Sequence, residues 1–234
     1  MGIFDKLLGK SKPVSQATAA DLAYVDLLSA YIGQARLHQL AFGEIVKGKD
    51  WDVDFTRGLI TFGEDSYPVQ FLGSESESSH TWLWGVENIN GFPEAVLTDV
   101  TRFHQNTVEK LRPAQLLLDE VVTGHNLASL ISASHPDNAC YYRCPYEGGA
   151  AYVLVKELDD SVFAPAPAMA VAEVIRHLIG QMPMNHRILV ESLLQANCQQ
   201  TEAVSTGIKG AFKAGDVLTA TFDTRGRLAA INIV

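Results

Sequence analysis

The feature that most constrains the fold is a long stretch, residues 17–46, in which apolar side chains recur at α-helical spacing. The stripe consists of Leu22, Val25, Leu28, Ile32 and Ala35. Thr18 and Asp21 have the spacing of a capping box at the start of this helix, and Gly43 and Gly48 bracket its end. An apolar stripe of this length has to be covered by other elements, so the rest of the chain is expected to pack against it.

Short segments with alternating, β-branched and aromatic residues follow the helix and predict strands. They cover residues 51–55, 59–62, 67–73 and 81–87, and a polar loop at 74–79 separates the last two. A helix is then expected to begin near Pro93 and to end at Pro113. Its apolar face consists of Val96, Val100, Phe103 and Leu111.

The second half of the chain is predicted to contain both element types again. The predicted elements are a helix at 125–134, a hairpin at 139–145 and 150–158, helices at 169–181 and 185–198, and three strands at 202–208, 216–222 and 228–234. The sequence Ala-Pro-Ala-Pro at 164–167 is the best internal linker. We therefore divide the chain into a tail at 1–14, an α+β region at 15–163 and a unit at 168–234 packed on the same core.

The predicted fold class is α+β, with a curved antiparallel sheet packed against the long N-terminal helix and further helices. Of the 234 residues, 47% are apolar and 19% are charged, which is typical of a globular protein. A chain of this length buries about 70% of its unfolded surface and needs neither a metal nor a disulfide to fold. We expect no bound cofactor.

The location is expected to be the cytoplasm. The first ten residues contain only two-residue apolar runs, too short for a secretory signal, and no stretch is apolar enough for a membrane span. The cysteines, Cys140, Cys144 and Cys198, form no even framework, which favours a compartment with reduced thiols.

The net charge of −9 is unevenly distributed, because no Lys or Arg occurs between Arg57 and Arg102. That stretch contains Glu64, Asp65, Glu75, Glu77, Glu87, Glu94 and Asp99. Such a surface repels phosphate backbones, so nucleic-acid binding is not expected. The stretch is either a solvated acidic surface or a docking surface for a basic protein partner. The residues predicted to contact such a partner are Glu64, Asp65, Glu75 and Glu77.

Trp82 and Trp84 stand two residues apart and therefore share one face of their strand. Two indole rings on one face either form the floor of a ligand pocket or pack a sheet against a helix. Glu87 and Asn88, at the end of the strand, are the nearest polar groups that would orient a ligand.

The remaining residues with reactive side chains form no recognisable catalytic or metal-binding motif. The histidines are His38, His80, His104, His125, His135, His177 and His186. Cys140 and Cys144 make one loose pair, whereas structural zinc sites use four ligands, so no metal site is predicted. Asp52 and Asp54 would share a strand face, but solvated carboxylates are the commoner arrangement. No catalytic residue is assigned.

Three segments of the sequence belong together: Trp51-Asp-Val-Asp-Phe55, Phe71-Leu-Gly-Ser74 and Thr81-Trp-Leu-Trp-Gly85 with Asn88. They resemble one bacterial family, catalogued as domain of unknown function number 6882. The family usually continues the tryptophan strand as Trp-Ala-Trp-Ala-Asn, and this chain departs from that pattern after Trp84. The resemblance extends in outline over residues 15–234 and implies a grouping, but no activity and no functional residues.

The last third of the chain is similar to the close of nuclear-transport-factor-like and cystatin-like folds, in which a curved antiparallel sheet wraps a long helix. Such folds include enzymes and pure binding proteins alike. The expected function is a non-enzymatic binding or interaction protein of a bacterial cytosol with an acidic docking face. The alternative is a small-molecule-binding domain or enzyme with a pocket near Trp82 and Trp84.

Overall fold

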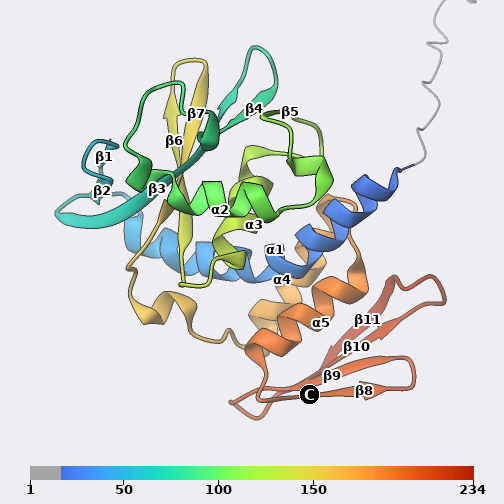
Figure 1. Ribbon diagram of the computed structural model, residues 1–234. Coiled ribbons are helices and arrows are strands. Elements are labelled where there is room, and N and C mark those ends of the chain that lie inside the picture. Colours follow the sequence, from blue (N-terminus) through green and yellow to red (C-terminus); the bar gives the residue numbers. More distant parts are fainter. Residues whose placement is uncertain (1–16) are drawn as a thin grey trace, which may run out of the picture.

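The computed structural model describes residues 17–234, which form five α-helices and eleven strands in two antiparallel sheets (Figure 1). The α+β class is confirmed, with a curled antiparallel sheet against a long N-terminal helix. The tail predicted at 1–14 lies outside the described residues. Among residues 17–234, no helix combines the length and the apolar character that crossing a bilayer requires.

The long helix α1 spans Ala19–Val46, close to its predicted bounds. The capping box is confirmed: the Thr18 hydroxyl accepts a hydrogen bond from the Asp21 amide at 3.1 Å, and the Asp21 carboxylate accepts one from the Thr18 amide at 2.9 Å. The predicted stripe is wrong at its first member, because Leu22 is 57% exposed. The buried face begins with Tyr24, since the first turn of α1 projects beyond the elements that cover the rest of the helix.

The larger sheet has seven strands. They are β1 (Trp51–Asp54), β2 (Leu59–Phe62), β3 (Asp65–Ser76), β4 (Thr81–Trp84), β5 (Gln115–Leu117), β6 (Cys140–Tyr146) and β7 (Gly149–Val155). The long strand β3 connects them: its first residues pair with β2, its last residues pair with β4, and β7 runs along most of its length. The hairpin of β6 and β7 is confirmed.

Several predicted strand bounds are wrong in this sheet. The segment predicted as a polar loop from residue 74 belongs to β3, because Ser74, Glu75 and Ser76 pair with β4 on one side and β7 on the other. These two ladders outweigh the low strand propensity of the polar residues. The strand predicted at 81–87 ends at Trp84 and continues as a 3-10 turn, Gly85–Glu87. The short strand β5 was not predicted.

The helix predicted between Pro93 and Pro113 is broken into three pieces. A 3-10 turn at Glu94–Val96 precedes the short helix α2, Thr98–Asn106, and another 3-10 turn follows at Glu109–Leu111. The backbone is extended at Thr107 and Val108, two β-branched residues that lower helix propensity.

The remaining helices and the smaller sheet correspond to predicted elements, with one correction. The helices are α3 (Gly124–Ser134), α4 (Ala168–Gln181) and α5 (His186–Asn197); the strands are β8 (Gln200–Val204), β9 (Gly207–Ala211), β10 (Val217–Phe222) and β11 (Leu228–Ile233). The segment predicted as one strand at 202–208 is instead a hairpin of β8 and β9, so this sheet has four strands rather than three. Its tight turn, Ser205–Thr206, lacks the Asn-Gly or Asp-Gly pair that marks a hairpin in a sequence.

Helix α1 lies between the larger sheet and the C-terminal helices α4 and α5 (Figure 1). Gly33 lets α5 approach closely, because a Cβ atom at that position would lie 2.7 Å from the Leu193 side chain. One core cluster joins residues from α1, the larger sheet, α4, α5 and β10. It includes Trp82 and Trp84, which are 0% and 1% exposed.

The burial of Trp84 predicts a large loss of stability on truncation. Trp84→Ala should lower the free energy of unfolding by about 3–5 kcal/mol, because it leaves a cavity in the main core. Trp84→Phe is the matched control: it fills much of the volume and loses no hydrogen bond, since Trp84 Nε1 has no partner among the described residues. Chemical denaturation measures both. An unchanged midpoint for Trp84→Ala would contradict the core position.

Candidate functional site

A group of ionisable and aromatic side chains gathers where the β6–β7 hairpin meets β3 and the start of α3. Pairing of β6 with β7 places Arg143 directly opposite Tyr152. Glu75 of β3 completes the group: it accepts hydrogen bonds from Arg143 Nε at 2.9 Å and from the Tyr152 hydroxyl at 3.0 Å. The Glu75 side chain is only 16% exposed, so this ion pair is largely shielded from water.

The first turn of α3 fits closely over this group because it begins with a glycine. A Cβ atom at Gly124 would lie 2.6 Å from a carboxylate oxygen of Glu75 and 2.7 Å from the Tyr152 hydroxyl. Thr123 caps the helix by accepting a hydrogen bond from the Asn126 amide at 3.0 Å. The close approach sets the ring of His125 edge-on to Tyr152, with the ring centroids 5.5 Å apart.

His125 also contacts Tyr141 of β6. Its Nδ1 atom lies 3.0 Å from the Tyr141 hydroxyl, so these two side chains share a hydrogen bond. Partial burial of the His125 ring lowers its pKa, the Glu75 carboxylate opposes this shift, and the Arg143 and Arg36 cations reinforce it. Burial raises the pKa of Tyr141. Near pH 7 both groups are therefore uncharged, and His125 keeps Nε2 free of any partner among the described residues.

The rings of Trp82 and Trp84 support this group from behind. Trp82 packs edge-on against Tyr152 at a centroid distance of 5.3 Å and against Trp84 at 5.5 Å. Two residues that the sequence singled out, Trp82 and Glu75, thus meet at Tyr152. Because Trp82 and Trp84 are fully buried, a ligand would reach them only after side chains had moved. Direct ligand contact by the two tryptophans stays a prediction.

A hollow of about 270 Å³ lies in front of His125 and Tyr141, between α1, α3, β6 and α4. We call it the polar groove. It is lined by Ile32, Arg36, Gln39, His125, Asn126, Ser129, Tyr141, His177, Leu178, Gln181 and Met182. Some of these polar groups hold the fold: Gln39 exchanges two hydrogen bonds with the Tyr141 backbone, and Asn126 donates one to the Val121 carbonyl.

Other groups in the polar groove remain available. Arg36, His125, His177 and Gln181 are exposed. No carboxylate of residues 17–234 forms an ion pair with Arg36. No Asp or Glu lines the groove either, although the whole chain carries a net charge of −9. The groove is therefore a locally cationic and donor-rich surface on an acidic protein.

A second hollow, of about 350 Å³, lies beside α2 and borders Asp99, Arg102 and His135. Here the charges already neutralise one another. Asp99 is contacted by Arg102 at 2.6 Å, by Lys156 at 3.0 Å and by His135 at 3.1 Å. The hydrogen bond with His135, followed by that with Lys156, lowers the pKa of Asp99 to about 2. The other ring nitrogen of His135 contacts the Asp137 backbone. The Asp99 cluster therefore joins α2, the end of α3 and the segment after β7.

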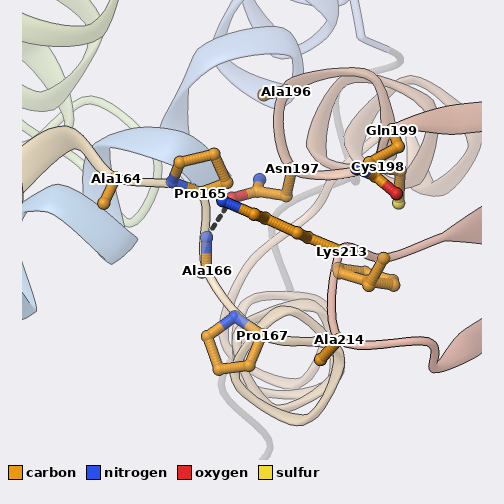
Figure 2. A pocket seen from close by; sticks show the side chains of 11 residues that line it. Ala164, Pro165, Ala166, Pro167, Ala196, Asn197, Cys198, Gln199, Lys213 and Ala214 are labelled. Carbon is orange, nitrogen blue, oxygen red and sulfur yellow. Dashed lines mark hydrogen bonds between the residues drawn. The ribbon is translucent and has the colours of Figure 1, made fainter.

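A third hollow, of about 420 Å³, lies between the linker at 164–167, the end of α5 and the turn before β10 (Figure 2). Its main polar side chain, Asn197, is fully engaged. The Asn197 carbonyl accepts a hydrogen bond from the Ala166 amide at 2.7 Å, and its amide donates to Gln34 and to the Leu193 carbonyl. Lys213 is the one charged residue of the lining, so this hollow offers little chemistry.

The cysteines serve packing. Cys140 and Cys144 lie in a second core cluster on the other face of β6 from Tyr141 and Arg143. Burial raises the pKa of both thiols to about 12 and that of Cys198 to about 11, which disfavours thiolate chemistry. Within residues 17–234, no three His, Cys, Asp or Glu side chains come together as metal ligands.

The structure separates the other residues singled out in the sequence. Asn88 closes its own loop through two hydrogen bonds with the Phe92 backbone, at 2.7 and 2.9 Å, and Glu87 is exposed beside it. Asp65 pairs with Lys49 at 2.7 Å. Positions 65 and 75 lie near opposite ends of β3, so Glu64 and Asp65 are separated from Glu75 and Glu77 by up to about 30 Å along the strand. Contact of these four residues with a partner stays a prediction.

A protein-family model matches the larger part of this chain. The model of the Family of unknown function (DUF6882) matches residues 25–158, more than half of the sequence. The chain belongs to this family. The match runs from α1 to just beyond β7 and is narrower than the span of the resemblance seen in the sequence. Comparisons with curated proteins and with solved structures gave no match.

The span that matches DUF6882 contains most of the candidate site. Arg36, Glu75, His125, Tyr141 and the hairpin residues lie within it, whereas His177 on α4 lies beyond it. The sequence predicted the hairpin but did not single out Arg143 and Tyr152 as a pair, although the turn that pairs them was visible. A two-residue turn at Glu147–Gly148 fixes the register that sets Arg143 opposite Tyr152. Nothing in the sequence indicates that α1 and α4 approach this hairpin.

The two glutamates predicted to act alike should behave differently when their charges are removed. Glu75→Gln should lower the free energy of unfolding by about 1–3 kcal/mol, because it weakens shielded hydrogen bonds to Arg143 and Tyr152. Glu77 is 66% exposed, and its carboxylate lies 4.0 Å from the Arg143 guanidinium, which is the outer limit of an ion pair. Glu77→Gln should therefore change stability by no more than about 0.5 kcal/mol. Urea denaturation of the two variants measures the difference, and equal midpoints would contradict the role of Glu75.

Proposed function

We propose that this protein is a non-enzymatic binding protein of a bacterial cytoplasm and that it holds a small molecule in the polar groove. The observation that carries the proposal is the set of uncommitted polar groups converging on one hollow from α1, α3 and α4. Ligand sites are concave and have a few polar groups that fix orientation. The volume, about 270 Å³, is at the lower end for such sites and fits a small ligand.

The reactive side chains support binding rather than catalysis. A nucleophile needs an adjacent base or a lowered pKa. Burial instead raises the pKa of Tyr141 in the groove and of all three thiols. His125 shares its hydrogen bond with Tyr141, and no carboxylate lines the groove to orient the ring. The reduced, separated cysteines are consistent with a cytoplasmic location.

A substitution that fills the groove tests this proposal. Gln181 is exposed at the end of α4 and borders the groove, so Gln181→Trp should occupy the space without disturbing the core. Compounds from a metabolite library that raise the melting temperature of the native protein should lose this effect in Gln181→Trp. The matched control is Gln195→Trp, at an exposed glutamine of α5 away from the groove, which should keep it. If every stabilising compound acted equally on both variants, the groove would not be the site.

We keep a second candidate, docking of a basic protein partner on the acidic stretch, because one observation favours it. Glu64, Glu87 and Glu94 are exposed and form no ion pair with any cation of residues 17–234. The structure also reduces the available charge. Asp65, Glu75 and Asp99 are paired with Lys49, Arg143 and Lys156, cations from outside the stretch.

For this second candidate, salt should act mainly on the association rate with the partner. Screening over about 8–10 Å at ordinary ionic strength weakens electrostatic steering, whereas dissociation depends on close contacts. Replacing Glu64 and Glu77 by Gln should lower the association rate without changing stability, because both side chains are exposed. Surface plasmon resonance at increasing salt, with a basic partner isolated by pull-down, measures this. A rate independent of salt and of both replacements would leave the stretch as a solubilising surface.

A further inference from the structure

We propose that the ligand of the polar groove carries a carboxylate or phosphate group, which binds between Arg36 on α1, His125 on α3 and His177 on α4. This inference rests on the proposed function and names its ligand class. The three basic side chains border one hollow and come from three different helices. Packing of the helices, rather than neighbouring sequence positions, therefore assembles a cationic site.

The first argument is the local charge. The chain has 27 acidic and 18 basic residues, yet the lining of the polar groove contains an arginine and two histidines and no acid. Arg36 forms no ion pair with the carboxylates of residues 17–234, whereas Arg102 is paired with Asp99, and Arg143 with Glu75 and Glu77. A guanidinium presents five N–H donors in a planar fork that matches a carboxylate or a phosphate. A neutral ligand that displaced water from Arg36 would leave the guanidinium with neither solvent nor a counterion.

The second argument is that the field of Arg36 reaches into the groove. Arg36 lowers the pKa of His125 and also that of Tyr141, although burial dominates both shifts. At His125 the Glu75 carboxylate opposes Arg36 and has the larger effect on the pKa, but this carboxylate is held by Arg143 and Tyr152 and does not line the groove. Glu173 borders the adjoining hollow, of about 210 Å³, together with Arg36 and His177. Glu173 does not line the groove itself.

Anion binding should be linked to protonation. The groups that face His125 are Arg36, Glu75, Tyr141, Arg143 and Tyr152. A bound anion adds a negative charge beside His125 and raises the pKa of the ring. By linkage, protonated His125 binds the anion more tightly, so the affinity should rise as the pH falls from 8 to 6.

The experiment uses two simple probes, inorganic phosphate and glutarate, with the full chain. Histidine ring signals are followed by NMR during titration with each probe, at pH 6 and at pH 8. We expect saturable shifts of the His125 and His177 signals with either probe. Tighter binding at pH 6 is expected for glutarate, because inorganic phosphate itself loses negative charge between pH 8 and pH 6. Arg36→Gln should weaken binding by roughly 10-fold or more, because charge-assisted hydrogen bonds are lost. Arg36→Lys keeps the positive charge but not the planar set of donors, so its affinity should lie between those of the native protein and Arg36→Gln.

Arg225→Gln is the matched control. Arg225 is an exposed arginine in the turn between β10 and β11, and its replacement changes the net charge equally while leaving the groove intact. If just one of the two probes binds, the proposal is supported, and that probe identifies the ligand class as phosphate or carboxylate. The proposal is overturned if neither probe shifts the two histidines, or if Arg36→Gln and Arg225→Gln bind equally. The two proposals fail in different ways. If a neutral compound binds the native protein and Arg36→Gln equally well but does not bind Gln181→Trp, the anionic ligand class is wrong and the proposed binding function still holds.

Discussion

The close packing of α1 against α5 is the contact on which the arrangement of the molecule depends. Gly33 has no side chain, and the Leu193 side chain occupies the space that a Cβ atom would need. The two helices therefore approach closely, and α1 lies between the larger sheet and the C-terminal helices. The same helix α1 also forms one wall of the polar groove. Its walls are α1, the start of α3 and the end of α4, and only a shared central helix brings them together.

Charge pairing between distant segments changes what the acidic stretch presents to solvent. In sequence it looks like a continuous negative surface, since no Lys or Arg occurs between Arg57 and Arg102. In the fold, Lys49, Arg143 and Lys156 come from outside the stretch and pair with its acids. Glu75 and Asp99 are shielded from water and require such partners, because an unpaired buried charge is costly, whereas the Lys49–Asp65 pair is exposed. Part of the acidity is thus structural, while the basic groups of the groove remain free.

The sequence predicted elements well where a local pattern decides them and poorly where neighbours do. The capping box and apolar stripe located α1, and the glycine-containing turn at 147–149 located the β6–β7 hairpin. The last part of β3, the strand β5 and the β8–β9 hairpin were missed, because polar or weakly patterned residues became strands only through pairing with adjacent strands. The broken helix near α2 was missed because the apolar spacing continued across the extended Thr107.

The sequence by itself determined the α+β class, the long first helix, the grouping in a family and the importance of the tryptophan strand. Of the ionisable residues of the candidate site, it named Glu75 and the histidines but not Arg36, Arg143 or Tyr141. What only the tertiary structure decided is which of them act together. Glu75 meets Arg143 and Tyr152, and Arg36 faces His125 and His177. These residues stand far apart in the chain, and their encounter is set by side-chain packing between elements, which no local spacing records.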